Sequence, residues 1–176
     1  CNTPVSTVQS GEVEDYQFTV ARKLILRKTT LGSAGGAFGY ALTNTVQTTG
    51  TVTTSVAGTP TTIDGDTAST ATQAYTITSP TTAVTINENT LPAGWQLTGA
   101  SCINASGATV GSLSGSTYTI TGAEIAASTS FTCTYTNTRL ARLVVTKLAI
   151  VGRATCAFAV TSGMGRASCR PNPNQP

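Results

Sequence analysis

The stretch VTINENTLPAGW, residues 84–95, predicts a buried strand that ends in a rigid turn. Val84 and Ile86 alternate with polar neighbours, which is typical of a strand with one face against a core. Glu88 continues this alternation, so its carboxylate is expected to point inward, where a charge costs free energy unless it is paired or neutralised. Proline and glycine then form a turn before Trp95, the only tryptophan. The sequence therefore predicts a core-facing acid that needs a partner.

Two other predicted strands carry a polar side chain at an apolar position. In the strand 23–28, Lys28 shares a face with two leucines. In the strand 130–137, Asn137 shares a face with a phenylalanine, a cysteine and a tyrosine. Because side chains alternate between the two faces of a strand, both polar groups are expected to point into the same core as Glu88.

Residues 88–95 resemble the E-T-x-x-P-x-G-Y/W signature of SpaA-type pilin domains and collagen-adhesin B-type repeats of large bacterial surface proteins. Lys28 and Asn137 resemble the first-strand lysine and the last-strand asparagine of the same family. The resemblance covers residues 22–139 and implies an all-β, prealbumin-like (transthyretin/Ig-like) antiparallel β-sandwich of about seven strands. It also implies that Lys28 and Asn137 can join in an intramolecular isopeptide bond, with Glu88 as the catalyst.

Elementary chemistry is compatible with such a reaction inside a sandwich. An apolar setting favours the neutral forms of lysine and glutamate, so Lys28 becomes a competent nucleophile. Protonated Glu88 would donate to the side-chain carbonyl of Asn137 and later carry the amine's proton to the leaving ammonia. The alternative is a buried Lys28–Glu88 ion pair, with Asn137 hydrogen-bonded beside it and no covalent bond. The sequence leaves both outcomes open.

The remaining elements are expected to be short. Between the two ends of the domain we expect strands at 37–43, 51–56, 73–79, 95–102 and 118–120, and one helical turn at 123–127. Polar loops are expected at 58–72 and 104–116.

The composition favours a β-rich extracellular protein. Charged residues make up only 10 % of the 176 residues, far below the usual quarter, whereas threonine, serine and glycine are frequent. The formal charge of +3 is too small to argue for nucleic-acid binding, and no apolar run is long enough to span a membrane. Histidine is absent, which excludes histidine-based catalysis and histidine-containing zinc sites, so we expect no metal and no cofactor.

The five cysteines are an odd number, and none of them forms a C-x-x-C pair. Cys102 and Cys133 lie within the domain and are expected to form a disulfide, which in an oxidising compartment contributes about 3.5–4 kcal/mol by loop entropy. Two buried free thiols are the alternative. Cys156 and Cys169 are a second candidate pair. Cys1 is then left over, and we expect either a partner upstream or a lipid anchor at this residue.

Three segments are expected along the chain. Residues 1–21 contain GEVEDYQFTV, which resembles the closing motif of a GEVED domain, so they are expected to be its C-terminal remnant. Their acidic side chains could bind calcium, although a solvated acidic turn is the simpler interpretation. Residues 22–139 are the SpaA-like domain. Residues 140–176 repeat its opening, LVVTK for LILRK, and are expected to be the truncated start of a second repeat within a longer parent protein.

The sequence favours a structural function at the bacterial cell surface, as a stalk or repeat module of an adhesin or pilus-like protein. The expected partners are neighbouring repeats of the same polypeptide, like subunits in a filament, or a host or matrix ligand. The alternative is a ligand-binding adhesin module that uses the loops 58–72 and 104–116. An enzyme ranks last, because no nucleophile–base pair is evident; at most the chain would catalyse its own single cross-link.

Overall fold

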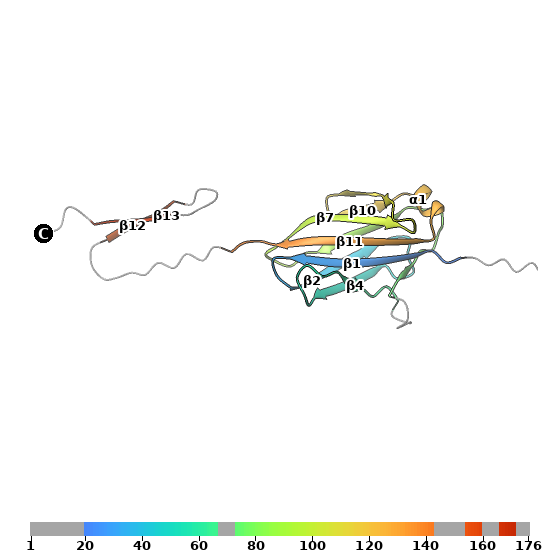
Figure 1. Cartoon of the computed structure of the whole chain (residues 1–176), viewed down its shortest axis with the longest axis horizontal. Helices are drawn as coiled ribbons and strands as arrows, with labels where there is room; N and C mark the ends of the chain where they lie inside the picture. The colour runs from blue at the N-terminus through green and yellow to red at the C-terminus, as the bar shows by residue number, and fades with distance from the viewer. Residues whose placement is uncertain (1–19, 67–72, 143–153, 160–165, 172–176) are drawn as a thin grey trace, which may run out of the picture. The chain divides into compact units, whose positions relative to one another are not determined.

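The computed structural model describes residues 20–66, 73–142, 154–159 and 166–171 of the chain (Figure 1). The chain divides into two compact units, Cys1–Ala141 and Arg142–Pro176. Cys1, nearly all of the GEVED-like motif and the repeated LVVTK pattern lie outside the described residues. The predictions made for them therefore stay predictions.

Short strands dominate the first unit, and the one helix among its described residues is only six residues long. The elements are β1 (Lys23–Leu31), β2 (Gly35–Leu42), β3 (Thr49–Thr54), β4 (Thr61–Ile63), β5 (Tyr75–Thr76), β6 (Val84–Thr90), β7 (Trp95–Asn104), β8 (Thr109–Val110), β9 (Ser112–Ser114), β10 (Thr117–Ile120), α1 (Gly122–Ala127) and β11 (Ser130–Arg139).

The strands form two sheets. One sheet has the order β4-β1-β11-β7-β8, with β5 pairing beside β4 on the same edge of β1, and the other has the order β3-β2-β6-β10-β9. The first strand and the last strand, β1 and β11, are parallel neighbours in the middle of the first sheet, and the other pairs are antiparallel. This architecture confirms the predicted all-β, prealbumin-like sandwich.

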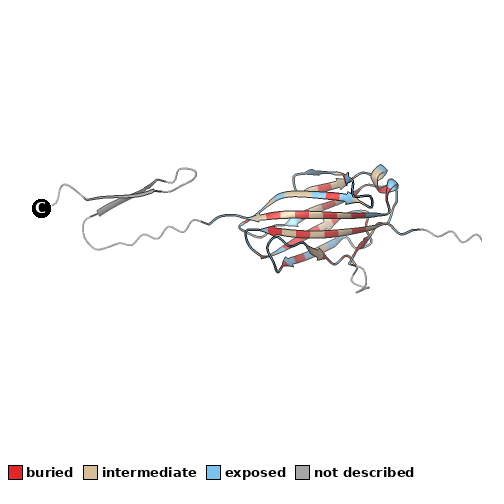
Figure 2. Cartoon of the chain, in the orientation of Figure 1, coloured by how far each residue is buried: buried red, intermediate tan, exposed pale blue. Residues whose placement is uncertain are grey.

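The core lies between the two sheets, where every second residue of a strand is buried. Figure 2 shows this alternation along β1 and β11 as bands of buried and intermediate residues. The same alternation holds for β6, whose buried positions include Glu88. The buried hydrophobic side chains come from both sheets and include Leu24, Leu26, Phe38, Tyr40, Tyr75, Ile86, Tyr118, Ile120, Phe131 and Tyr135.

The edges of the sheets contain strands that the polar sequence did not predict. The expected loop 58–72 contains β4, and the expected loop 104–116 contains β8 and β9. An edge strand needs only backbone hydrogen bonds to one neighbour, so such segments can pair without an apolar pattern. Conversely, the expected strand 73–79 is reduced to the two residues of β5 and an isolated bridge between Thr45 and Ile77.

Two β-bulges interrupt the antiparallel ladders next to the predicted site. In β6, Asn89 has no partner in β2, because Gly39 pairs with Thr90 and Tyr40 pairs with Glu88. In β7, Thr98 has no partner in β11, because the register shifts there as well. A bulge bends its strand and re-aims the neighbouring side chains.

The two cysteines among the described residues of the first unit form a disulfide. Cys102 in β7 and Cys133 in β11 are direct partners across the ladder, and their sulfur atoms are bonded inside the core. In the second unit, β12 (Ala154–Ala159) and β13 (Arg166–Pro171) form an antiparallel hairpin. Its backbone register sets Cys156 opposite Cys169. Their pairing as a disulfide stays a prediction.

Replacing both Cys102 and Cys133 with alanine should destabilise the first unit. The disulfide closes a loop with a sequence separation of 31 residues. A loop of this length restricts the unfolded chain by about 3.5–4 kcal/mol, and that contribution disappears in the double variant. Urea unfolding of the two chains under oxidising conditions measures the difference. Reduction of the unaltered chain should produce a similar loss, and equal midpoints for all samples would contradict this account.

Candidate functional site

Three polar side chains meet between the two sheets of the first unit. Lys28 comes from β1, Asn137 from β11 and Glu88 from β6, and their exposed fractions are 0 %, 0 % and 5 %. In the parallel β1–β11 ladder, Lys28 lies opposite Tyr135 and Thr30 lies opposite Asn137. Lys28 and Asn137 are therefore diagonal neighbours on one face, and Glu88 reaches toward them from the other sheet.

The carboxylate of Glu88 contacts both of the other groups. The Nζ atom of Lys28 donates to Glu88 Oε1 at 2.5 Å, and the two groups form a buried ion pair. The Nδ2 atom of Asn137 donates to Oε1 and to Oε2 at 3.1 Å each. Lys28 and Asn137 thus share one acceptor, which keeps the amine next to the side-chain amide.

One acceptor in this cluster has no partner. Among the described residues, the Oδ1 atom of Asn137 is buried and accepts no hydrogen bond. A buried polar atom without a partner costs about 1–3 kcal/mol, so most native structures avoid it. A half-turn of the amide about the Cβ–Cγ bond would direct Oδ1 toward Glu88, where a protonated carboxyl group could donate to it.

Aromatic side chains of β2 form the wall of the site. The Lys28 Nζ atom lies 4.2 Å from the ring centroid of Phe38, whose ring meets Trp95 edge-on at a centroid distance of 5.3 Å. The hydroxyl group of Tyr40 donates to Glu88 Oε1 at 3.0 Å. The sequence predicted a strand over residues 37–43 but did not single out Phe38 or Tyr40 as parts of the site. The alternation in this segment puts both aromatic residues on one face, but it does not reveal which groups that face meets.

Burial governs the protonation of the cluster. Desolvation lowers the pKa of Lys28 to about 8, and the hydrogen bond and charge of Glu88 oppose this shift only in part. Burial and the neighbouring Glu88 carboxylate raise the pKa of Tyr40, so its phenol stays protonated. The lysine can therefore change its charge near pH 8.

The Pro-Gly turn fastens the end of β11. The Arg139 side chain donates to the carbonyl of Ala93 at 3.3 Å, and its guanidinium group lies over the Trp95 ring at 5.3 Å. The backbone N–H of Leu140 donates to the carbonyl of Gly94 at 2.9 Å. Gly94 has a φ of +80°, and a Cβ atom there would lie 3.3 Å from the guanidinium group. The turn therefore needs glycine and holds β11 two residues beyond Asn137.

Among the described residues, no group of three or more acidic, cysteine or histidine side chains could hold a metal ion. No helix in the described part of the chain has the length and apolar character required to cross a membrane. The acidic residues that were considered for calcium, Glu12, Glu14 and Asp15, lie outside the described residues.

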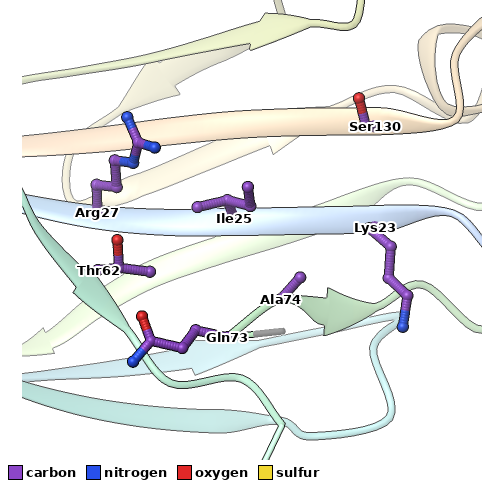
Figure 3. A pocket seen from close by; sticks show the side chains of 7 residues that line it. All are labelled: Lys23, Ile25, Arg27, Thr62, Gln73, Ala74 and Ser130. Carbon is purple, nitrogen blue, oxygen red and sulfur yellow. The ribbon is translucent and has the colours of Figure 1, made fainter. Parts of the chain in front are cut away.

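A separate hollow of about 410 Å³ lies on the outer face of the first sheet, away from the core cluster. Figure 3 shows Lys23 and Arg27 at opposite ends of this hollow, with Ile25 between them. The other side chains lining it are Thr62, Gln73, Ala74 and Ser130. Thr62 belongs to the segment 58–72, which sequence analysis gave as the alternative ligand-binding loop.

In a chain with Asn137→Ala, which cannot form the cross-link, Lys28 should titrate near pH 8 rather than near 10.5. Between these values the unfolded chain still holds a proton that the folded chain has released. Stability should therefore rise with pH across this window. Carbon NMR of the lysine side chain measures the titration, and urea unfolding at several pH values measures the stability. A midpoint near 10.5 would contradict the assigned burial effect.

The comparisons with known proteins agree with this architecture. A family model described as a prealbumin-like fold domain, of SpaA type, matches residues 24–139. No curated protein and no solved structure is significantly similar to the chain. The match spans both strands that supply Lys28 and Asn137, the strand that supplies Glu88 and the whole sandwich between them. The chain belongs to the SpaA-type family of prealbumin-like fold domains.

Proposed function

We propose that the first unit is a structural module of an extracellular bacterial surface protein, and that an isopeptide bond between Lys28 and Asn137 reinforces it. The proposal rests on the buried contact of three groups, Lys28, Glu88 and Asn137, inside a pilin-like sandwich. The site thus holds an amine nucleophile, an amide acyl group and a carboxyl group that can transfer protons, and these are the groups that formation of an amide bond requires. Their burial excludes water from the acyl carbon.

The reaction starts from the ion pair. Transfer of a proton from Lys28 Nζ to Glu88 leaves a neutral amine and a carboxylic acid, a step favoured by the desolvation that lowers the pKa of Lys28. The Asn137 amide turns by half a rotation, so that Oδ1 accepts a hydrogen bond from the acid. This contact satisfies the acceptor that has no partner among the described residues. The carbonyl is thereby polarised toward attack.

Attack then forms a bond between Lys28 Nζ and the Cγ atom of Asn137, and the bond between Cγ and Nδ2 breaks. Two protons leave Nζ in the course of the reaction. Glu88 passes one of them to Nδ2, which departs as ammonia, and the other stays on Glu88. No oxidant, metal or cofactor takes part. Glu88 acts in a single turnover, because the amide that forms is stable.

The product would tie β11 to both of its neighbours. The disulfide already joins β11 to β7. The isopeptide bond would join it to β1, the neighbour on its other side. Three adjacent strands would then be covalently connected through β11, in keeping with a module whose task is to stay folded outside a cell.

The intact mass of the purified, reduced chain should be lower than that of the sequence by one ammonia. Glu88→Ala should abolish the loss, because the acid that moves the protons is gone. Glu124→Ala is the control, since this half-buried carboxylate accepts from the backbone of Gly111 and Thr121 at the start of α1, takes no part in the cluster and should leave the mass loss intact. A full mass for the unaltered chain would refute the covalent bond and leave the ion pair as the final state.

A second candidate function is binding of an anionic ligand at the hollow beside β1. Lys23 and Arg27 provide positive charge at its ends, Ile25 and Ala74 provide apolar surface, and none of the described residues that line it is acidic. Cavities of this size accommodate small molecules or one or two residues of a peptide. This arrangement supports the adhesin alternative, with a ligand that carries carboxylate groups.

A glutamate-rich peptide should shift the amide resonances of Ile25 and Thr62 when it is titrated into isotope-labelled protein. Arg27→Ala should weaken this binding about 10-fold, the effect of losing one charge-assisted hydrogen bond. Arg142→Ala removes an equal charge outside the hollow and should leave the affinity unchanged. Equal losses in the two variants would indicate unspecific charge attraction and contradict a site at the hollow.

A further inference from the structure

We propose that Tyr40 is the positioning residue that holds the Glu88 carboxyl group in place throughout formation of the isopeptide bond. This inference rests on the cross-link proposed above and extends it to a residue outside the three reacting groups. The hydroxyl group of Tyr40 donates to Glu88 Oε1 at 3.0 Å, and both side chains are buried.

Among the described residues, three side chains donate to Glu88, and Tyr40 is the one that the reaction leaves unchanged. Lys28 loses its charge when its proton moves, and Asn137 must turn its amide and lose Nδ2. Two of these three contacts to the carboxylate therefore change during the reaction. Without a further contact, Glu88 would be free to leave the acyl carbon once the ion pair is neutralised. The Tyr40 hydroxyl supplies that contact.

The backbone sets Tyr40 opposite Glu88. The two residues are direct partners in the β2–β6 ladder, where their pair continues the regular register of Leu42 with Ile86 and Ala41 with Asn87. The bulge at Asn89 follows immediately and pairs Gly39 with Thr90. Gly39 permits this close approach, because a Cβ atom there would lie 2.8 Å from the Cβ atom of Thr90. The tyrosine and the acid therefore form the last regular pair before the bulge, with both side chains buried in the core.

The ring of Tyr40 is itself fixed. It meets the ring of Tyr135 edge-on, at a centroid distance of 5.3 Å and an interplanar angle of 75°. Tyr135 is held in turn by its hydroxyl group, which donates to the carbonyl of Ile86 at 2.5 Å and accepts from the N–H of Tyr118 at 3.1 Å. A hydroxyl on a rigid ring can hold a carboxyl group in one orientation. Because its phenol stays protonated, Tyr40 remains a donor.

Tyr135 offers a matched control for this role. Tyr40→Phe and Tyr135→Phe each remove one buried hydroxyl group and keep the edge-on ring pair. Only the first removes a hydrogen bond to Glu88, since the Tyr135 hydroxyl contacts backbone groups in the described residues. A purely structural role would make the two variants alike.

The test follows ammonia loss during refolding of the full chain. Protein isolated unfolded from inclusion bodies is diluted into oxidising buffer, quenched in acid at intervals, reduced and weighed by intact mass spectrometry. Tyr40→Phe should slow the loss of ammonia about 10- to 100-fold, the scale expected when a proton-transfer group is misplaced, whereas Tyr135→Phe should react at nearly the original rate. Urea unfolding of both variants in the Asn137→Ala background measures stability where no bond forms.

A slower reaction of Tyr40→Phe, at a stability similar to that of Tyr135→Phe, supports the positioning role. Equal rates in the two variants, with normal cross-linking of the unaltered chain, overturn this inference and leave the proposed function standing. Equal slowing that follows the loss of stability in both variants also overturns it. Absence of ammonia loss in the unaltered chain overturns the cross-link and this inference together.

Discussion

The contact between Lys28 and Glu88 is the interaction on which the rest of the sandwich depends. It crosses from one sheet to the other in a core that is mainly apolar or aromatic. Removing one partner of a buried pair leaves an uncompensated charge, which destabilises a fold far more than the pair stabilises it. The surrounding side chains stabilise both buried charges. Tyr40 and Asn137 donate to the carboxylate, and Phe38 presents its ring to the ammonium group.

The irregular features of the neighbouring strands lie next to this contact. The bulge at Asn89 directly follows the pair of Glu88 and Tyr40, and the bulge at Thr98 lies beside the pairing of Asn137. The Pro-Gly turn is linked to the strands of both Glu88 and Asn137. It follows β6 directly, and the side chain of Arg139 binds it to the end of β11. The family signature thus combines an acid with the turn that fixes the strand carrying its amide partner. Each part of the motif has a physical reason to occur with the others.

Alternation of side chains was sufficient to predict the inward faces of β1, β6 and β11, and with them the three polar groups of the site. It could not predict that Tyr40 contacts Glu88, because alternation shows which face of its own strand a residue occupies and not which residue of another strand lies opposite it. The strands β4, β8 and β9 were also missed. They lie in segments rich in threonine, serine and glycine, where backbone pairing at a sheet edge decides the structure and side-chain pattern does not.

The parallel pairing of β1 and β11 has a mechanical consequence. The chain enters the sandwich at the start of β1 and leaves it at the end of β11, and these two points lie at opposite ends of one ladder of nine residue pairs (Figure 1). Tension along the polypeptide therefore loads the whole ladder in shear, so its hydrogen bonds must yield together and cannot be peeled apart one by one. A covalent bond from Lys28 to Asn137 would carry that force across the ladder and leave every residue from 29 to 136 outside the loaded path.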